Sequence, residues 1–242
     1  MLDVTLFFLL VAFLAPLPDL WLYPRLVRAS AAGVPGARPR YYAAGVAFLW
    51  ILAACAIALA IRHRLWSSFH IGAVSPLRIA IGSLFVIAHG TLVFRQRRAI
   101  LAKPERLQRL MQLNQGAEAL FPRTRGELRG FSLLALSAGF CEEIVCRGFM
   151  MGFLTMRIGV IPAVILSSIL FGFAHLYLGM KHVIRTAIIG LAFALIVLAS
   201  GSLWPAIVIH SIFDLLAGDL AIRAFRQRDP SSVISQPITA QA

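Results

Sequence analysis

Apolar residues along the chain form long runs and not the short alternations of a soluble sheet protein. A window of roughly 19 residues finds about seven such runs, each close to the ~20 residues that a helix needs to cross a bilayer. The expected helices lie near residues 2–21, 42–61, 76–94, 130–151, 158–178, 183–200 and 203–222. The pattern therefore predicts an all-α fold, a polytopic transmembrane helix bundle of about seven spans that encloses an intramembrane cavity.

The first run is the least regular, because Pro16, Pro18 and Asp19 interrupt it. A cleaved signal peptide is a competing interpretation of this run. However, no basic region precedes the apolar residues, and Pro16 follows Ala15 where a cleavage site would fall. We therefore expect a membrane helix here.

Composition supports the membrane interpretation and argues against a nucleic-acid binder and a disulfide scaffold. The 242 residues are 60% hydrophobic and 14% charged, whereas soluble domains are roughly 25% charged. A net charge of +13 would suggest nucleic acid, but nucleic-acid binders are rich in charge and this chain is not. Three cysteines make no disulfide scaffold. The expected surroundings are a lipid bilayer, with no nucleic-acid partner.

The basic residues suggest an orientation. If the N-terminus is outside, most Lys and Arg fall in the inner segments, and the outer ones are Arg62, Arg64, Arg78 and Arg157. The positive-inside rule then predicts an N-out, C-in multipass protein. A small chain of this kind, with no soluble domain, is typical of a bacterial plasma membrane.

Two segments differ from the membrane runs. Residues 95–129 are basic and amphipathic, a pattern that suits either the membrane surface or a solvated connecting helix. The tail is polar and is expected to be disordered. The predicted organisation is residues 1–128 as N-terminal helices with the basic segment, 129–226 as a membrane core, and 227–242 as the tail.

Ionisable residues inside the predicted spans need a reason, because each costs roughly 2.5–3.5 kcal/mol to insert at mid-membrane. Within the run Cys141–Arg147, Glu143 and Arg147 stand four apart on one helix face and can neutralise each other. Glu142 is rotated by about 100° from Glu143. We therefore expect Glu142 to be the free carboxylate that is available for chemistry.

Two further clusters lie on later spans. Phe171 and His175 share a helix face, so the aromatic ring can pack against the imidazole. His210 and Asp214 also stand four apart, and an acid beside an imidazole fixes its tautomer and favours its charged form. Two histidines and an unpaired glutamate in one bundle predict an active site.

The three motifs Glu-Glu-x-x-x-Arg at 142–147, Phe-x-x-x-His at 171–175 and His-x-x-x-Asp at 210–214 occur in this order on successive spans. In this respect residues 129–218 resemble the CPBP family. That family comprises CAAX prenyl endopeptidases and membrane proteins related to bacteriocin processing and immunity.

The resemblance implies a glutamate-dependent intramembrane protease that uses no metal and no cofactor. Its substrate would be a membrane-associated or C-terminally tagged protein. Glu142 would be the general base that activates water, with the assistance of His175, and His210 with residue 214 would stabilise the oxyanion. The structural residues at the site would be Glu143, Arg147 and Phe171.

Position 214 departs from the family pattern. The prenyl-protease branch typically has asparagine there, and an ionised aspartate cannot donate to an oxyanion. Either Asp214 is protonated, or it supports His210 as a cation and His210 is the donor. We expect the second arrangement.

Three other functions are alternatives. A non-catalytic immunity or interaction protein could use the same scaffold. A zinc-dependent protease with two histidines and one glutamate is compatible with the residue types, although the His-Glu-x-x-His motif is absent. A small transporter could use the carboxylates as a proton relay, but no duplicated halves are evident.

Overall fold

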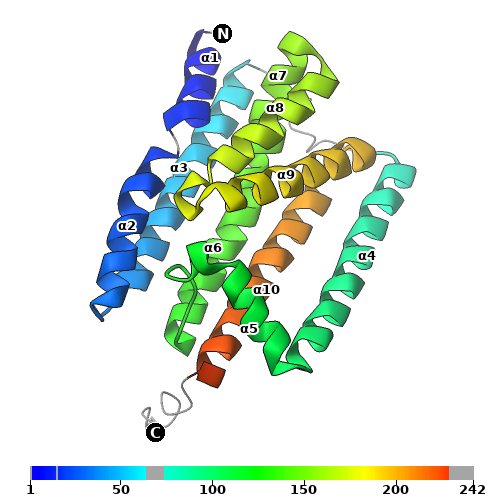
Figure 1. The fold of residues 1–242 in the computed structure, drawn as a ribbon. Coiled ribbons are helices and arrows are strands. Elements are labelled where there is room, and N and C mark those ends of the chain that lie inside the picture. Colours follow the sequence, from blue (N-terminus) through cyan, green and yellow to red (C-terminus); the bar gives the residue numbers. More distant parts are fainter. Residues whose placement is uncertain (1, 15, 64–73, 229–242) are drawn as a thin grey trace, which may run out of the picture.

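A computed structural model describes residues 2–14, 16–63 and 74–228, and these are overwhelmingly helical with no strand among them. The predicted all-α bundle is confirmed (Figure 1). Of the predicted disordered tail, residues 229–242 lie outside the described part of the chain. The elements, in chain order, are α1 (Leu2–Leu9), η1 (Leu10–Leu14), α2 (Leu17–Ala31), α3 (Ala37–His63), α4 (Pro76–Leu101), α5 (Pro104–Leu113), η3 (Gln115–Ala117), α6 (Arg125–Glu143), η4 (Ile144–Met150), α7 (Met151–Ile158), α8 (Val160–Phe173), η5 (Leu176–Leu178), α9 (Met180–Ser200) and α10 (Trp204–Arg228).

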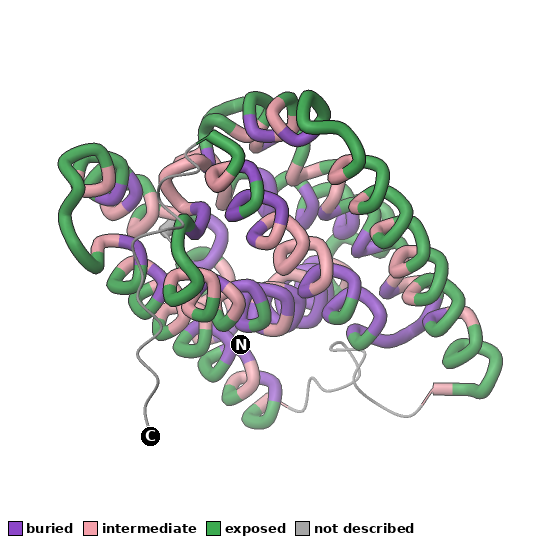
Figure 2. The backbone as a smooth tube through the Cα atoms, turned by 90° about the horizontal axis from the view of Figure 1, so that it is seen from below, coloured by how far each residue is buried: buried purple, intermediate pink, exposed green. Residues whose placement is uncertain are grey.

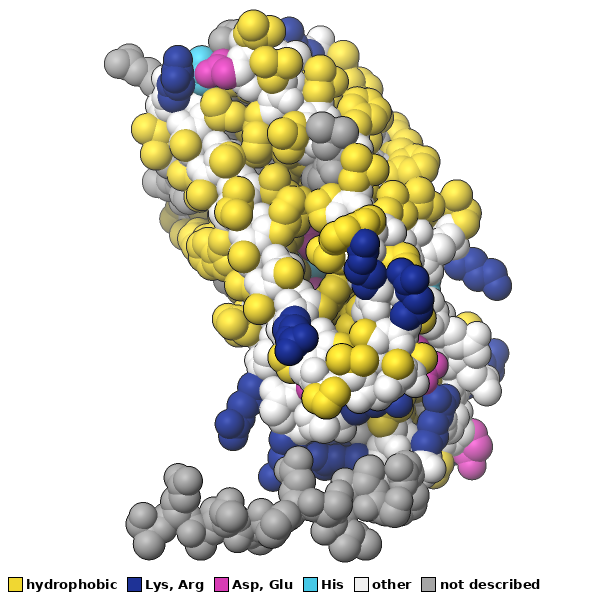
Figure 3. All heavy atoms as spheres, turned by 90° about the vertical axis from the view of Figure 1, so that its left-hand side faces the viewer, with side chains coloured by type: hydrophobic (Ala, Val, Ile, Leu, Met, Phe, Trp, Pro, Cys, Tyr) yellow, Lys and Arg dark blue, Asp and Glu magenta, His cyan; other side chains and the backbone are white. Residues whose placement is uncertain are grey.

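The outer surface is apolar over most of its height. Large side chains such as Leu84 and Ile87 on α4 and Ile188 on α9 are exposed, and hydrophobic atoms cover most of the face seen in Figure 3. Water-soluble monomers rarely expose patches of this size. The segments long and apolar enough to cross a bilayer are Leu2–Ala31, Ala37–His63, Pro76–Leu101, Met180–Ser200 and Trp204–Arg228. The chain is an integral membrane protein.

The two remaining predicted spans have a different form. The run predicted at 130–151 lies within α6, η4 and α7, which follow one another without a break. The run predicted at 158–178 is an α-helix only over the 14 residues of α8. At 1.5 Å per residue α8 is about 21 Å long, which is less than the ~30 Å hydrocarbon core.

Helices α6 and α10 form the centre of the bundle, where they pack along each other. In Figure 1, α9 crosses over them, α3 lies along one flank and α4 stands at the outer edge. Seen along the bundle in Figure 2, buried positions gather on the inner helices while the outer helices are largely exposed. This arrangement surrounds the middle of α6 and α10 with protein on several sides.

A glycine allows α6 and α10 to approach closely at this point. A Cβ atom added at Gly139 would lie 2.2 Å from the Ser211 hydroxyl, 2.8 Å from its backbone nitrogen and 3.0 Å from its Cα. No side chain fits in that space. The contact lies one turn before Glu143 and next to His210. Backbone packing therefore sets the distance between the polar residues of α6 and those of α10.

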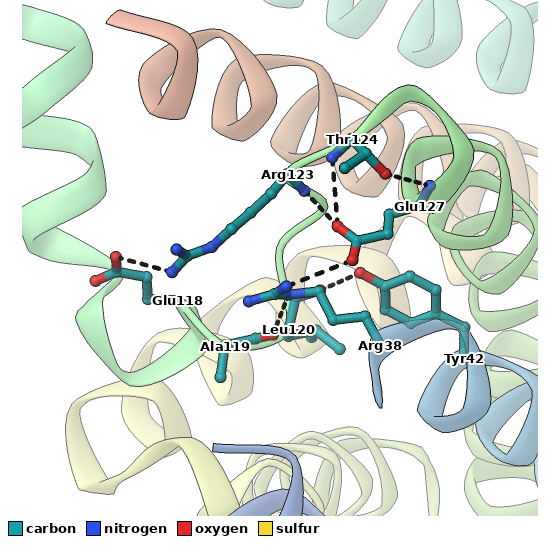
Figure 4. A network of polar contacts seen from close by, with 8 residues as sticks. All are labelled: Arg38, Tyr42, Glu118, Ala119, Leu120, Arg123, Thr124 and Glu127. Atoms are coloured by element: carbon teal, nitrogen blue, oxygen red, sulfur yellow. Dashed lines mark hydrogen bonds and ion pairs between the residues drawn. The ribbon is translucent and has the colours of Figure 1, made fainter. Parts of the chain in front are cut away.

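A polar network holds the start of α6 (Figure 4). Thr124 caps the helix by accepting from the Glu127 backbone N–H, and the Glu127 side chain accepts in return from the Thr124 N–H. From α3, Arg38 bonds to Glu127 at 3.4 Å and the Tyr42 hydroxyl donates to the Leu120 carbonyl at 2.6 Å. These bonds tie α3 to α6 and fix the loop that precedes α6.

The amphipathic pattern of residues 95–129 is explained largely by packing on the protein. Residues 95–101 continue α4, and Leu107 and Met111 on α5 are buried in a cluster with residues of α6 and α10. Leu113, at the end of α5, is exposed. The buried apolar face of α5 thus contacts other helices.

Basic residues gather at one end of the bundle. Helices α2, α4 and α10 end there, and α3 and α6 begin there (Figure 1). These helix ends carry the predicted basic segments, and Figure 3 shows dark blue side chains concentrated around this lower end. The structure thus has the charge asymmetry from which the orientation was predicted.

Candidate active site

A cavity of about 310 Å³ lies inside the bundle, with walls from α2, α3, α6, α9, α10 and the turn after α8. Glu142 from α6, His175 from that turn, and His210 and Asp214 from α10 all line it. Residues that are up to 72 positions apart in sequence thus meet at one cavity. The predicted catalytic set is brought together in space.

Glu143 lies behind this cavity wall, in a buried network. Its Oε1 atom is 2.9 Å from the Arg147 Nη1 atom and 2.9 Å from the His210 Nδ1 atom. The Glu143 side chain is 0% exposed and the Arg147 side chain 1% exposed. The ion pair predicted from their spacing is present, but the same carboxylate oxygen also binds a histidine on another helix.

Arg147 is enclosed on every side. Its Nη2 atom donates to the Gly190 carbonyl of α9 at 3.0 Å, and its guanidinium lies 4.1 Å from the centre of the Phe171 ring and 5.5 Å from that of Phe193. A planar guanidinium suits such stacking better than an ammonium group. Phe171 therefore contacts Arg147 on one side and, with ring centres 5.1 Å apart, His175 on another.

The His210 ring is held by three carboxylates and an aromatic face. Its Nδ1 atom bonds to Glu143, while its Nε2 atom lies 3.5 Å from Asp214 Oδ2 and 3.9 Å from Glu142 Oε2. Phe193 stacks on the ring with centres 5.0 Å apart. An ionised carboxylate only accepts, so carboxylates facing both nitrogens suit an imidazolium that donates from both.

Glu142 has the environment expected of a free carboxylate. Its side chain is 21% exposed and lines the cavity. Within the described part of the chain, its Oε2 atom has no hydrogen-bond partner. A rotation of about 100° along one helix thus separates Glu142 from the buried Glu143.

His175 is oriented by the backbone. Its Nδ1 atom lies 3.0 Å from the Phe171 carbonyl oxygen. A carbonyl oxygen only accepts, so Nδ1 carries the hydrogen in this bond. In the neutral ring, Nε2 is then an acceptor. The two histidines therefore differ: His175 offers a lone pair, whereas His210 offers a proton.

The helix changes form where the polar cluster begins. Residues Ile144–Met150 are π-helical and follow directly on Glu143. Single turns of π-helix occur mostly inside α-helices and often at functional sites. The sequence predicted a regular α-helix across this region, because no local pattern distinguishes the two.

The sequence does not predict several polar residues that line the cavity, among them Asp19, Tyr41 and Arg185. Asp19 on α2 accepts a 2.6 Å hydrogen bond from the Tyr41 hydroxyl, and both residues line the cavity. Arg185 on α9 lines it too. In the sequence, Asp19 marks an interruption of an apolar run, although an acid in a membrane helix is itself a sign of function.

The structure also places Asp219 and bears on the metal alternative. Asp219 binds Arg97 at 2.8 Å and Arg223 at 2.9 Å, and it does not line the cavity. Among residues 2–14, 16–63 and 74–228, no three His, Cys, Asp or Glu side chains lie where they could hold a metal ion. The geometry of these side chains gives the zinc alternative no support.

Residues 125–216 match the family model described as Type II CAAX prenyl endopeptidase Rce1-like. The match supports the similarity of this core to the CPBP/CAAX protease family. The match contains every predicted site residue and agrees closely with the 129–218 segment expected from the motifs. No curated protein and no solved structure matches the chain. The family supports a membrane-embedded CAAX-type protease that acts on a protein or peptide.

Proposed function

We propose that this chain is a metal-independent glutamic endopeptidase that cleaves a peptide bond within the bilayer. One observation carries the proposal. Glu142 faces the cavity without a hydrogen-bond partner among the described residues, beside a histidine whose two nitrogens face carboxylates. This pairs a base with a fixed donor, as acyl transfer to water requires.

In the first step, Glu142 takes a proton from water and the resulting hydroxide attacks the carbonyl carbon. The neutral His175 accepts the second hydrogen bond of that water at Nε2 and so orients it. The electron pair of the C=O bond moves to oxygen, which becomes the oxyanion. The Nε2–H group of His210 donates to this oxygen.

In the second step, the tetrahedral intermediate collapses. The oxyanion re-forms the carbonyl and the C–N bond breaks. Glu142 returns its proton to the departing nitrogen, so the products are a carboxylic acid and an amine. The carboxylate of Glu142 is regenerated, and the reaction consumes only water.

The buried network supports this chemistry without touching the reacting atoms. Glu143 fixes the His210 ring through Nδ1, so that Nε2 points to the cavity side where Asp214 and Glu142 lie. Arg147 compensates the charge of Glu143 at 2.9 Å. Asp214 acts as a positioning residue that keeps His210 in its cationic, donating form.

The substrate class and the orientation belong to the same proposal. We infer a membrane-associated or C-terminally tagged protein as substrate, because the site opens into a cavity with many apolar side chains inside a membrane bundle. The gathering of basic residues at one end supports an N-out, C-in orientation, and the small multipass architecture suits a bacterial plasma membrane.

The test compares purified wild type with Glu142→Gln in vesicles. Prenylated and unprenylated peptides with free C-termini serve as substrates, and mass spectrometry reads the products. We expect wild type to cleave and Glu142→Gln to lose at least about 10³-fold in kcat. Cys146→Ala, a change at a thiol that also lines the cavity, is the matched control and should retain activity.

Three outcomes contradict the proposal. Equal product from wild type and Glu142→Gln would disprove the glutamate mechanism, and loss of activity in a chelator would support the zinc alternative. Absence of product from wild type on every peptide would instead favour a non-catalytic interaction protein on this scaffold.

A further inference from the structure

One acid at the cavity has no cationic partner. Of the described residues, the acids that line the cavity are Asp19, Glu142 and Asp214. Glu142 and Asp214 both face the His210 ring, at 3.9 Å and 3.5 Å. In the part of the chain that the structure describes, no basic side chain forms an ion pair with Asp19. An acid in a membrane bundle is costly without a partner and often marks the path of a substrate, so the position of Asp19 needs an explanation.

The Asp19 carboxylate is fixed at the cavity wall. The Tyr41 hydroxyl of α3 donates to its Oδ1 atom at 2.6 Å. Tyr23, four residues after Asp19 on α2, is 5% exposed, and its hydroxyl donates to the Gly116 carbonyl. A carboxylate can accept about four hydrogen bonds, so one bond from Tyr41 leaves most of this capacity open to another donor.

Three tyrosine rings lie beside this carboxylate. Tyr23 packs edge-on against Tyr41, with ring centres 6.3 Å apart, and against Tyr177, with centres 5.1 Å apart. Tyr41 and Tyr177 line the cavity, and no described residue forms a hydrogen bond with the Tyr177 hydroxyl. Aromatic rings attract cations, and a tyrosine oxygen can accept from an ammonium group. A carboxylate with these rings is therefore suited to bind an organic cation.

This group of residues lies close to the proposed reacting groups. Tyr177 stacks on His175 with ring centres 6.2 Å apart, and Asp19 is near enough to His175 to interact with it electrostatically. His175 is neutral in the proposed mechanism and does not compensate the charge of Asp19. An extended peptide advances ~3.3–3.6 Å per residue, so a basic side chain that reaches Asp19 belongs to a residue within about two positions of the scissile bond.

We propose that Asp19, Tyr41 and Tyr177 form a subsite for a basic side chain of the peptide substrate, within about two positions of the bond that is cut. The inference rests on the proposed proteolysis. The ammonium or guanidinium group donates to Asp19 and packs against the tyrosine rings, so that bound substrate compensates the charge of Asp19. Asp19 thus determines specificity and takes no part in bond breaking.

The experiment uses peptides that differ at one position, where lysine is replaced by norleucine, an apolar residue of similar length. The scissile bond is mapped by mass spectrometry, and the exchange is made in turn at the two positions on each side of it. At one of these positions, wild type should have a KM about 10- to 100-fold lower for lysine. Asp19→Asn should reduce this ratio to about 1, and Asp19→Glu should keep part of it. Asp219→Asn is the matched control, because Asp219 binds Arg97 and Arg223 and does not line the cavity.

The separation of KM from kcat distinguishes this role from a catalytic one. Equal KM values for lysine and norleucine at every position in wild type would overturn the proposal, while cleavage itself would leave the proposed function intact. If Asp19→Asn instead lowers kcat by the same factor for every peptide, Asp19 acts through His175 and the subsite is wrong.

Binding gives a measurement that does not depend on cleavage. Fluorescence anisotropy of the labelled lysine and norleucine peptides is recorded with Glu142→Gln and with the double variant Asp19→Asn, Glu142→Gln. A preference for lysine that Asp19→Asn removes supports the subsite, even if wild type yields no product and the proposed function fails. Equal binding of the two peptides to Glu142→Gln contradicts the subsite.

A lipid headgroup is the other source of an ammonium group. The assays are therefore repeated in vesicles of phosphatidylglycerol with and without phosphatidylethanolamine. A preference for lysine of the same size in both vesicles supports the peptide as the occupant. If the effect of Asp19→Asn requires phosphatidylethanolamine and is the same for the lysine and norleucine peptides, the subsite holds a lipid and the proposal is wrong.

Discussion

Glu142 and Glu143 are neighbours in the chain, yet they lie in two different regions of the molecule. Glu143 is fully buried and shares one oxygen between Arg147 and His210. Glu142 is 21% exposed and lines the cavity. The difference shows that one step along a helix separates a carboxylate that holds the fold together from one that can react.

The two histidines repeat this division. His210 belongs to the buried region through Glu143, whereas His175 bonds to a backbone carbonyl at the cavity. His210 bonds to a charged carboxylate and is prepared to donate, whereas His175 bonds to a neutral carbonyl and is prepared to accept at its other nitrogen. Substitutions in the buried region should change stability, and substitutions on the cavity wall should change only turnover.

The largest expected effect on stability comes from Arg147→Met. Removing one partner of a buried ion pair leaves Glu143 uncompensated and costs about 3–5 kcal/mol. We expect a clear fall in the thermal midpoint in detergent, whereas Glu142→Gln should leave the midpoint nearly unchanged. Arg125→Met, at an exposed position on α6, is the control for loss of an arginine. Equal midpoints for Arg147→Met and Glu142→Gln would contradict the division into two regions.

The histidines should separate in the same way. His210→Ala removes the proposed oxyanion donor and should lower kcat by about 10²–10³-fold, with a lower thermal midpoint. His175→Ala should lower kcat by roughly 10²-fold at an unchanged midpoint. Kinetics and thermal unfolding on the same preparations make the comparison. If both variants lose stability equally, His175 has a structural role.

Gly139→Ala tests whether backbone contact sets the distance between the regions. The new methyl group would collide with the backbone of Ser211 as well as its hydroxyl, so the helices must separate at a cost of about 1–3 kcal/mol. Activity should fall with stability. Gly126→Ala, where a Cβ meets only Thr124 Oγ1 at 3.9 Å, should retain both. Full activity in Gly139→Ala would show that the site tolerates a wider spacing.

The smallest effect is expected at Asp214. Asp214→Asn keeps an oxygen that can accept from His210 and should retain much of the activity, while Asp214→Ala should lose most of it, on the order of tenfold. Steady-state rates of both variants decide the matter. Equal losses would mean that Asp214 does not act by supporting His210.

Local spacing was sufficient to predict the parts of the site that lie on one helix. The pair of Glu143 with Arg147 and the separate direction of Glu142 follow from 3.6 residues per turn. The bond from Glu143 to His210 could not be predicted, because it depends on how α6 packs on α10. The same holds for Arg185, whose charge resembled other basic residues near helix ends.

The fold was predicted in class and less well in detail. Apolar runs show where helices occur, but they do not distinguish the 14-residue α8 from a full span, nor a π-helical turn from an α-helical one. The amphipathic segment around Leu107 was expected to lie on the membrane surface or to be a solvated connecting helix. Its apolar face packs on α6 and α10 instead, which only tertiary structure determines.

The residues that line the cavity come from two parts of the chain. The proposed reacting groups all lie within residues 125–216, the part that matches the family, whereas Asp19, Tyr41 and their neighbours on α2 and α3 line the same cavity from outside that segment. Substitutions on α2 and α3 can therefore reshape the space for a substrate without altering any of those groups. Exchanging α2 and α3 would therefore be a way to alter substrate specificity while the proposed catalytic residues stay unchanged.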